Sequence, residues 1–145
     1  MEVFTIGFTK KSAEGFFGLL KRHGIKRLVD VRLNNVSQLA GFTKREDLQF
    51  FLREICGAEY HHEPLLAPTQ DILEAYRKKK SSWKEYEQKF LTLMASRKIE
   101  ERLDYSLFAI PAVMLCSEPT PDHCHRRLVV EYLQNKWGDL QVKHL

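Results

Sequence analysis

The segment from Cys116 to Arg126 carries the densest group of reactive side chains in the chain. It reads Cys-Ser-Glu-Pro-Thr-Pro-Asp-His-Cys-His-Arg, so two thiols, two imidazoles and a guanidinium fall within one short stretch. A thiolate is a strong nucleophile, and a positive neighbour favours its formation. The segment therefore predicts thiol chemistry with Cys116 or Cys124 as the nucleophile. His123 or His125 is the candidate partner of that thiol.

The same segment also suits the binding of an anion. Asp122 is a candidate N-cap for the helix that follows, and the first turn of a helix offers unpaired N–H groups and a partial positive charge. His125 or Arg126 beside that turn would complete a pocket for a phosphate or carboxylate group. A second interpretation is structural: Arg126 pairs with a neighbouring acid such as Glu118, and the thiols are buried, as cysteines commonly are.

Metal binding is a third interpretation of this segment. Thiolate, imidazole and carboxylate groups are all ligands that zinc accepts. Structural zinc sites, however, usually take their ligands from close pairs two to four residues apart, whereas seven residues separate Cys116 from Cys124. The spacing therefore argues against a structural zinc site, and we assign no metal ligand.

The elements that must position these residues alternate between strand-like and helix-like patterns along the whole chain. Strands are predicted at residues 3–6, 28–31, 58–61, 112–116 and 140–144, and helices at 12–24, 43–57, 69–80, 82–103 and 122–138. Neighbouring parallel strands need crossover connections, usually helices. The alternation therefore predicts a single α/β domain over residues 1–145, a three-layer sandwich with a doubly wound, mainly parallel sheet of about five strands.

Several local signals define the helices more closely. Residues 43–46 and 82–85 both have the Ser/Thr-x-x-Glu pattern of a capping box, which marks the start of a helix. The apolar stripe of the first of these helices includes Ile55. Apolar residues also recur at helical spacing between Trp83 and Leu103, which predicts one helix of about five turns.

In sheets of this kind, ligands usually bind beyond the carboxyl ends of the strands. Arg32 directly follows the second predicted strand, and Cys116 ends the fourth. Arg32 either contacts substrate or forms an ordinary ion pair with Asp30. Gly7 ends the first strand, where it allows a tight turn or the close approach of another group. We predict one pocket, with Cys116, Cys124 and His125 as reactive residues and Arg32, Glu118 and Arg126 as substrate-binding residues.

Composition limits the class of protein. The chain has 145 residues, of which 43% are apolar and 11% aromatic, so a disordered or low-complexity protein is excluded. No apolar run approaches the ~20 residues that span a membrane, and the N-terminal residues have no signal-peptide pattern. The odd number of cysteines favours free thiols over a disulfide framework. These features predict a cytoplasmic protein with no membrane partner.

The charge of the chain does not by itself name a partner. The net charge of +4 permits the binding of a polyanion without requiring it. A basic run at residues 77–80, close to Trp83 and Tyr86, can contact a nucleic-acid backbone, although most such runs are solvated helix ends. The glycine-rich fingerprints of phosphate-binding and dinucleotide-binding loops are absent from the sequence.

Several segments of the chain carry a resemblance to a known family. They are Phe4-Thr5-Ile6-Gly7, Val29-Asp30-Val31-Arg32, Leu65-Leu66-Ala67-Pro68-Thr69 and Leu115-Cys116-Ser117-Glu118, the last followed by Cys124-His125-Arg126. In these segments the chain resembles the domain-of-unknown-function 488 family. The resemblance implies a small cytosolic α/β protein of bacteria or archaea, and its motif positions match the six predicted site residues. The chain departs from the family at Gly7-Phe8-Thr9, where Gly-His-Ser or Gly-Tyr-Ser is common, and the loop at 33–41 lacks the usual proline.

The sequence therefore favours an enzyme that acts on a phosphorylated or otherwise anionic substrate, such as a nucleotide or a nucleic-acid component. The first alternative is a non-catalytic module that binds nucleotide or nucleic acid at the same edge of the sheet. The second is a metal-binding protein. The residues name no cofactor.

Overall fold

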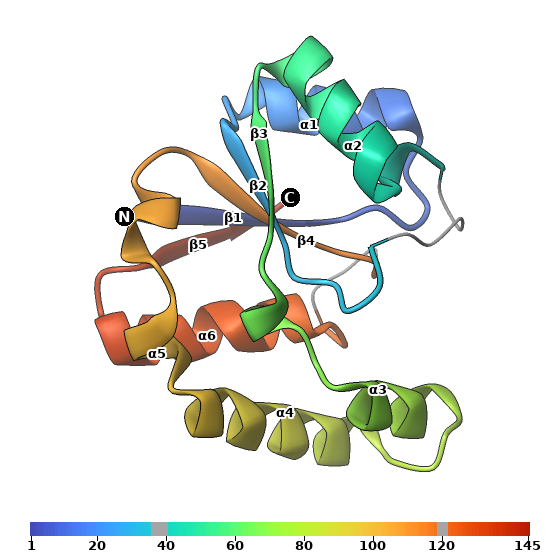
Figure 1. Cartoon of the computed structure of the whole chain (residues 1–145), viewed down its shortest axis with the longest axis vertical. Helices are drawn as coiled ribbons and strands as arrows, with labels where there is room; N and C mark the ends of the chain where they lie inside the picture. The colour runs from blue at the N-terminus through green and yellow to red at the C-terminus, as the bar shows by residue number, and fades with distance from the viewer. Residues whose placement is uncertain (36–40, 119–121) are drawn as a thin grey trace.

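The computed structural model describes residues 1–35, 41–118 and 122–145. In this part of the chain, five strands form a single sheet and six α-helices cover it (Figure 1). The strands are β1 Glu2–Gly7, β2 Arg27–Asp30, β3 Glu59–His62, β4 Ala112–Cys116 and β5 Gln141–His144. The helices are α1 Ala13–Arg22, α2 Arg45–Phe51, α3 Gln70–Arg77, α4 Trp83–Arg97, α5 Ile99–Arg102 and α6 His125–Trp137.

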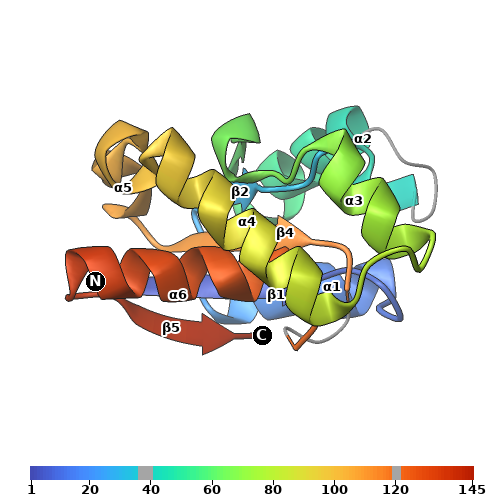
Figure 2. The ribbon, with the colours of Figure 1, turned by 90° about the horizontal axis from the view of Figure 1, so that it is seen from below.

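The sheet is parallel throughout, and its strand order is β3-β2-β4-β1-β5. Helices α1 and α2 cover one face, whereas α4 and α6 cover the other, where α4 crosses α6 (Figures 1 and 2). The predicted α/β sandwich with a mainly parallel sheet of about five strands is therefore confirmed. None of the described helices has the length and apolar character needed to cross a membrane.

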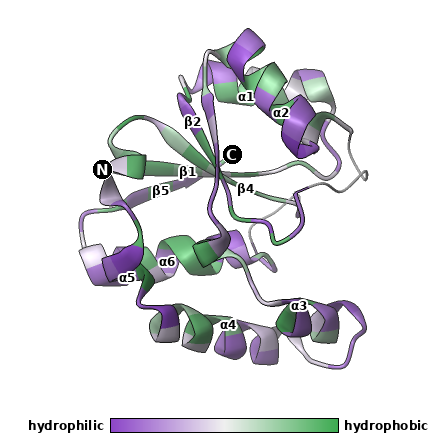
Figure 3. Ribbon diagram, viewed as in Figure 1, coloured by the Kyte–Doolittle hydropathy of each residue, from purple (hydrophilic) through white to green (hydrophobic). Residues whose placement is uncertain are grey.

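Strand β4 occupies the centre of the sheet because all five of its residues are apolar and buried. Its alternate side chains point to opposite faces, as the strand geometry requires. Val113 and Leu115 belong to the core under α1 and α2, whereas Met114 and Cys116 belong to the core under α4 and α6. Figure 3 shows the resulting pattern, with hydrophobic central strands and helices of mixed character. The pleat of β4 thus directs Cys116 toward α6.

The helix predicted from Trp83 to Leu103 is interrupted, so that prediction is wrong. Lys98 has a left-handed backbone conformation, with φ of 52°, and it ends α4 before the short helix α5 begins. Its backbone N–H bonds to the carbonyl oxygen of Ala95. Ile99 and Leu103 are still buried, because the turn at Lys98 redirects the chain without moving its apolar side chains out of the core.

Two details of the helix beginning after residue 43 were also predicted wrongly. Thr43 is buried and precedes the N-cap position, which Lys44 occupies without a side-chain capping bond. Ile55 is 41% exposed. The reason is that Leu52–Cys56 forms a π-helical turn, whose wider i→i+5 spacing shifts the side chains away from the predicted stripe. The other capping pattern is confirmed at its serine, because Ser82 Oγ accepts a hydrogen bond from the backbone N–H of Glu85 at 3.2 Å.

The break at Lys98 predicts opposite effects for two glycine substitutions, one at the break and one in the middle of α4. Glycine avoids the steric cost of a left-handed conformation, so Lys98→Gly is expected to raise the free energy of unfolding by about 0.5–1 kcal/mol. Lys89 is exposed in the middle of α4, where glycine is a poor helix former, so Lys89→Gly is expected to lower it by about 1 kcal/mol. Urea denaturation measures both, and a loss of stability in both variants would contradict the role given to Lys98.

Candidate functional site

A cavity of about 660 Å³ opens at the carboxyl edge of the sheet. Its walls come from the loops that follow β1, β2 and β4, from the start of α6 and from the connection between α3 and α4. Five of the six predicted site residues line it: Arg32, Cys116, Glu118, Cys124 and His125. The sixth, Arg126, is fully buried and is not among the lining residues.

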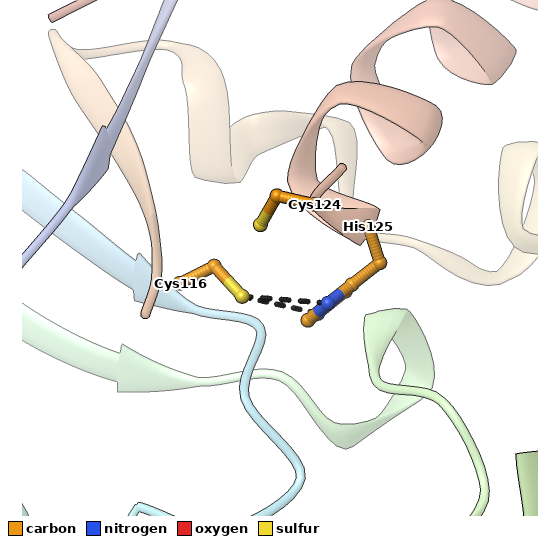
Figure 4. A group of neighbouring side chains, drawn as sticks. All are labelled: Cys116, Cys124 and His125. Atoms are coloured by element: carbon orange, nitrogen blue, oxygen red, sulfur yellow. Dashed lines mark hydrogen bonds between the residues drawn. The ribbon is translucent and has the colours of Figure 1, made fainter. Parts of the chain in front are cut away.

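Cys116 and His125, two of the predicted reactive residues, are in direct contact. The sulfur of Cys116, the last residue of β4, lies 3.4 Å from Nδ1 and 3.9 Å from Nε2 of His125, the first residue of α6. Figure 4 shows Cys116, His125 and the neighbouring Cys124 converging from these two elements. Because the sulfur is almost equally distant from both ring nitrogens, it does not lie on the lone-pair axis of Nδ1.

The ring of His125 is held by the end of β2. Its Nε2 lies 2.7 Å from the backbone oxygen of Val31, and a carbonyl oxygen can only accept, so Nε2 carries a proton. The edge of the ring also packs against Phe90 of α4, with ring centroids 5.4 Å apart. Nδ1 is therefore the nitrogen that remains for proton exchange beside the Cys116 thiol.

Arg126 brings a positive charge into the core beneath this pair. Its Nη1 donates to the backbone oxygen of Glu118 at 2.6 Å and to the sulfur of Cys124 at 3.7 Å, and its Nε donates to Thr5 Oγ1 at 3.3 Å. The alternative ion pair between Arg126 and the Glu118 side chain is not formed, and no described carboxylate pairs with Arg126. The thiols are the nearby groups able to supply a compensating negative charge.

The two thiols differ in how readily they take up this negative charge. A hydrogen bond from Cys124, a second from the backbone of Ser117 and the charge of Arg126 lower the pKa of Cys116 in spite of its burial. Burial raises the pKa of Cys124 well above its ordinary value, and the neighbouring Cys116 raises it further. The pair therefore takes its first negative charge on Cys116.

Arg32 forms the predicted ion pair with Asp30 and keeps one donor free. Its Nε and Nη2 bond to the two carboxylate oxygens of Asp30 at 2.9 and 2.8 Å, and Nη2 also donates to the backbone oxygen of Thr43 at 2.7 Å. Within the described residues, Nη1 is buried without a partner. Asp30 thus fixes the guanidinium at the wall of the cavity.

Gly7 allows the Arg126 arrangement to form. It pairs with Cys116 in the register of β1 and β4. A Cβ atom on Gly7 would lie 1.5 Å from the backbone oxygen of Glu118 and 2.7 Å from Nη1 of Arg126. The backbone N–H of Thr9 also donates to the oxygen of Ser117 at 2.9 Å. The glycine is therefore needed for the close approach of the loop after β4, not for contact with a ligand alone.

The N-cap of α6 differs from the prediction. Cys124 occupies the N-cap position, its side chain makes no capping hydrogen bond, and Asp122 lies outside the helix. A carboxylate therefore does not occupy the first turn of α6, contrary to what the sequence suggested for Asp122. Cys124 therefore stands at the positive end of α6, whose partial charge favours an anion.

An aromatic and basic wall of the cavity was missed by the choice of site residues. Trp83 stacks on His123 with ring centroids 5.0 Å apart, and Tyr76 packs against Trp83 at 5.6 Å. Arg77 and Lys79, from the predicted basic run, line the same cavity. The run is close to Trp83 in the sequence, but no sequence pattern predicts that it lies against the loop after β4 in the fold.

The donors of Cys116, Cys124 and His125 lie within 4.8 Å of one another, so a shared metal ion must be considered. Two thiolates, an imidazole and one open position are a ligand set that zinc accepts. The sulfur of Cys116 lies well away from the lone-pair axis of Nδ1, however, whereas an ion bound by Nδ1 would have to lie on that axis. Turning the ring to reach such an ion would break its hydrogen bond to Val31. The geometry therefore favours a direct thiolate–imidazole contact.

Comparison with known proteins gives one match. Residues 12–133 match the family model described as Domain of unknown function DUF488. The matched range contains all six predicted site residues, whereas β1 and β5 lie outside it. The search of curated proteins and the search of solved structures returned no significant match.

The close approach at Gly7 predicts a strong effect of a single methyl group. Gly7→Ala is expected to lower the free energy of unfolding by about 1–3 kcal/mol, because the Cβ atom overlaps the backbone of Glu118. Gly18→Ala is the matched control: Gly18 is exposed on α1, its added Cβ would meet no atom within 4 Å, and alanine is the better helix former. Urea denaturation compares the two, and equal stability of both variants would contradict the packing described for Gly7.

Proposed function

We propose that this chain, which belongs to the DUF488 family, is a thiol-dependent enzyme that acts on a phosphorylated or otherwise anionic substrate. The observation that carries the proposal is the Cys116 sulfur at the wall of a cavity, 3.4 Å from His125 and backed by the buried charge of Arg126. In this proposal, Cys116 is the nucleophile and His125 exchanges the proton. Arg126 is a positioning residue that stabilises the thiolate from behind.

The third cysteine of the chain supports the choice of nucleophile. Cys56 is also buried, on the opposite face of the sheet, and burial raises its pKa. Cys116 is buried as well, yet its pKa is lowered. A thiol with a purely structural role has no need of this stabilisation, whereas a nucleophilic thiol depends on it. The contrast within one chain favours a reactive Cys116 over a merely buried one.

For a phosphate monoester, the proposed reaction has two steps. The thiolate of Cys116 attacks phosphorus, an S–P bond forms, the bond to the leaving oxygen breaks, and that oxygen takes a proton from His125. A water molecule then attacks phosphorus, gives one proton to His125 and releases phosphate, which restores the thiolate. Because Nε2 of His125 is occupied by Val31, the proton moves at Nδ1.

The charges around the cavity favour an anionic substrate. Arg32, Arg77 and Lys79 line it, and Glu118 is the one carboxylate among its described lining residues. Nη1 of Arg32, which has no partner among the described residues, is a hydrogen-bond donor for such a substrate. The positive charges of Arg77 and Lys79 add long-range attraction.

Among anionic substrates, the aromatic wall favours a nucleotide or a nucleic-acid component. Tyr76, Trp83 and His123 present rings to the same cavity that Arg77 and Lys79 line. Aromatic rings stack on bases of any sequence, and neighbouring cations bind the phosphates. A module that binds such molecules without turnover is the alternative, and a turnover measurement separates the two.

The first test measures thiolate formation. Alkylation by iodoacetamide requires the thiolate, so its rate falls as the pH drops below the pKa of each thiol. Cys116 is expected to keep its full rate to a lower pH than Cys56, because the pKa of Cys116 is lowered and that of Cys56 is raised. Mass spectrometry of the labelled peptides gives both profiles from the same sample. Identical profiles for the two thiols would remove Cys116 as the nucleophile.

The second test measures anion binding and turnover. Inorganic phosphate and adenosine monophosphate are expected to slow the alkylation of Cys116 in a saturable way. Neutralising the two rim cations with R77Q and K79Q is expected to weaken this protection several-fold. The matched control carries K78Q and K80Q, which remove the same charge from exposed positions that do not line the cavity. Equal protection in both double variants would contradict binding at this rim.

Turnover is followed with para-nitrophenyl phosphate and with mononucleotides. Cys116→Ser is expected to lose turnover while phosphate still protects its Cys124 from alkylation. Protection of the native protein without turnover of any phosphate ester would favour the non-catalytic alternative.

A further inference from the structure

We infer that Cys116 and Cys124 are a redox modification site, at which a hydroperoxide oxidises Cys116 and Cys124 resolves the product as an intramolecular disulfide. Formation of the disulfide does not depend on the proposed function. Its consequence, the reversible loss of the nucleophile, rests on that function.

The positions of the two sulfurs support this pairing. Cys116 ends β4 and Cys124 precedes α6, and both side chains line the same cavity. The two sulfurs lie within 4.8 Å of each other, and Figure 4 shows the sulfur of Cys124 directed toward Cys116. Formation of a disulfide bond of about 2.05 Å requires rotation of the two side chains toward each other. A small hydroperoxide reaches both thiols through the cavity without unfolding of the protein.

The two thiols are chemically distinct, as a nucleophilic and a resolving cysteine must be. In the reduced protein, the first negative charge of the pair forms on Cys116, and that charge opposes ionisation of Cys124. Conversion of Cys116 to an uncharged sulfenic acid removes that opposition. Arg126, whose Nη1 lies 3.7 Å from the sulfur of Cys124, then stabilises a thiolate on Cys124. Oxidation of the first thiol thus activates the second.

The chemistry balances for hydrogen peroxide. The thiolate sulfur of Cys116 attacks one peroxide oxygen, the O–O bond breaks, and the leaving hydroxide takes up the proton that the Cys116 thiol released on ionisation and becomes water. The sulfur of Cys124 then attacks the sulfenic sulfur of Cys116, the S–S bond forms, and the hydroxyl group takes up the proton of the Cys124 thiol and leaves as a second water. The two thiols lose two electrons and the peroxide gains them. A dithiol reductant reverses the change by thiol–disulfide exchange.

Cys56 cannot take the place of Cys124. It lies in the core on the other face of the sheet, and its thiol contacts the backbone oxygen of Phe17 at 3.8 Å. The chain therefore contains an internal control thiol that is buried but remote from the pair.

The test is peroxide treatment of the full chain followed by blocking of free thiols, digestion without reductant and mass spectrometry. We expect a peptide cross-linked between Cys116 and Cys124, a free and blocked Cys56, and recovery of both thiols after treatment with dithiothreitol. Cys124→Ser is expected to stop at the sulfenic acid of Cys116, which dimedone traps, and to proceed to sulfinic acid at higher peroxide. Cys124→Ala is a second variant with the same expectation, and Cys56→Ser is expected to form the cross-link as the native protein does.

Over-oxidation of Cys116 in the native protein without a cross-link would overturn the inference, and so would a cross-link that includes Cys56. These outcomes are independent of the alkylation and turnover measurements on reduced protein. A missing cross-link together with phosphate turnover would remove the disulfide and leave the proposed function. A cross-link between Cys116 and Cys124 without protection by phosphate would support the disulfide and remove the proposed function.

Discussion

The buried charge of Arg126 is the constraint on which the candidate site depends. Removal of a guanidinium from water costs several kcal/mol unless hydrogen bonds and a compensating charge replace the lost hydration. The protein supplies oxygen acceptors from β1 and from the loop after β4, together with the sulfur of Cys124. No carboxylate among the described residues pairs with Arg126, so its positive charge favours ionisation of the neighbouring thiols instead. The electrostatics of the site follow from this one buried group.

The parallel sheet positions the residues of the site around Arg126. The pleat of β4 directs Cys116 toward α6, the backbone of Val31 at the end of β2 holds His125, and Gly7 at the end of β1 admits the loop that bonds Arg126. Each of the three strands thus fixes one part of the site through its carboxyl end. Rigid elements, not flexible side chains, set the contact between thiol and imidazole.

The parts of this structure that depend on local pattern could be predicted from the sequence. The strands, most helices and the edge at which Arg32 and Cys116 meet follow from periodicity and from the rules of parallel sheets. The burial of Arg126 and the packing of Trp83 on His123 could not, because both depend on contacts between segments far apart in the chain. The prediction that Asp122 caps α6 was wrong for a related reason. An aspartate caps a helix only if it directly precedes the first helical residue, and Cys124 occupies that position.

The strand order also has a consequence for folding during synthesis. Among the described strands, β1 pairs only with β4 and β5. The first strand to leave the ribosome therefore gains a neighbour only when residues more than 100 positions later have been synthesised. Non-local pairings of this kind slow folding and leave apolar strand edges exposed in the growing chain. A nascent chain that ends before β4 can pair β2 with β3 but cannot complete either core. Assembly of the sheet, and with it every contact of the thiol pair, is therefore a late and cooperative event that begins when residues 112–116 become available.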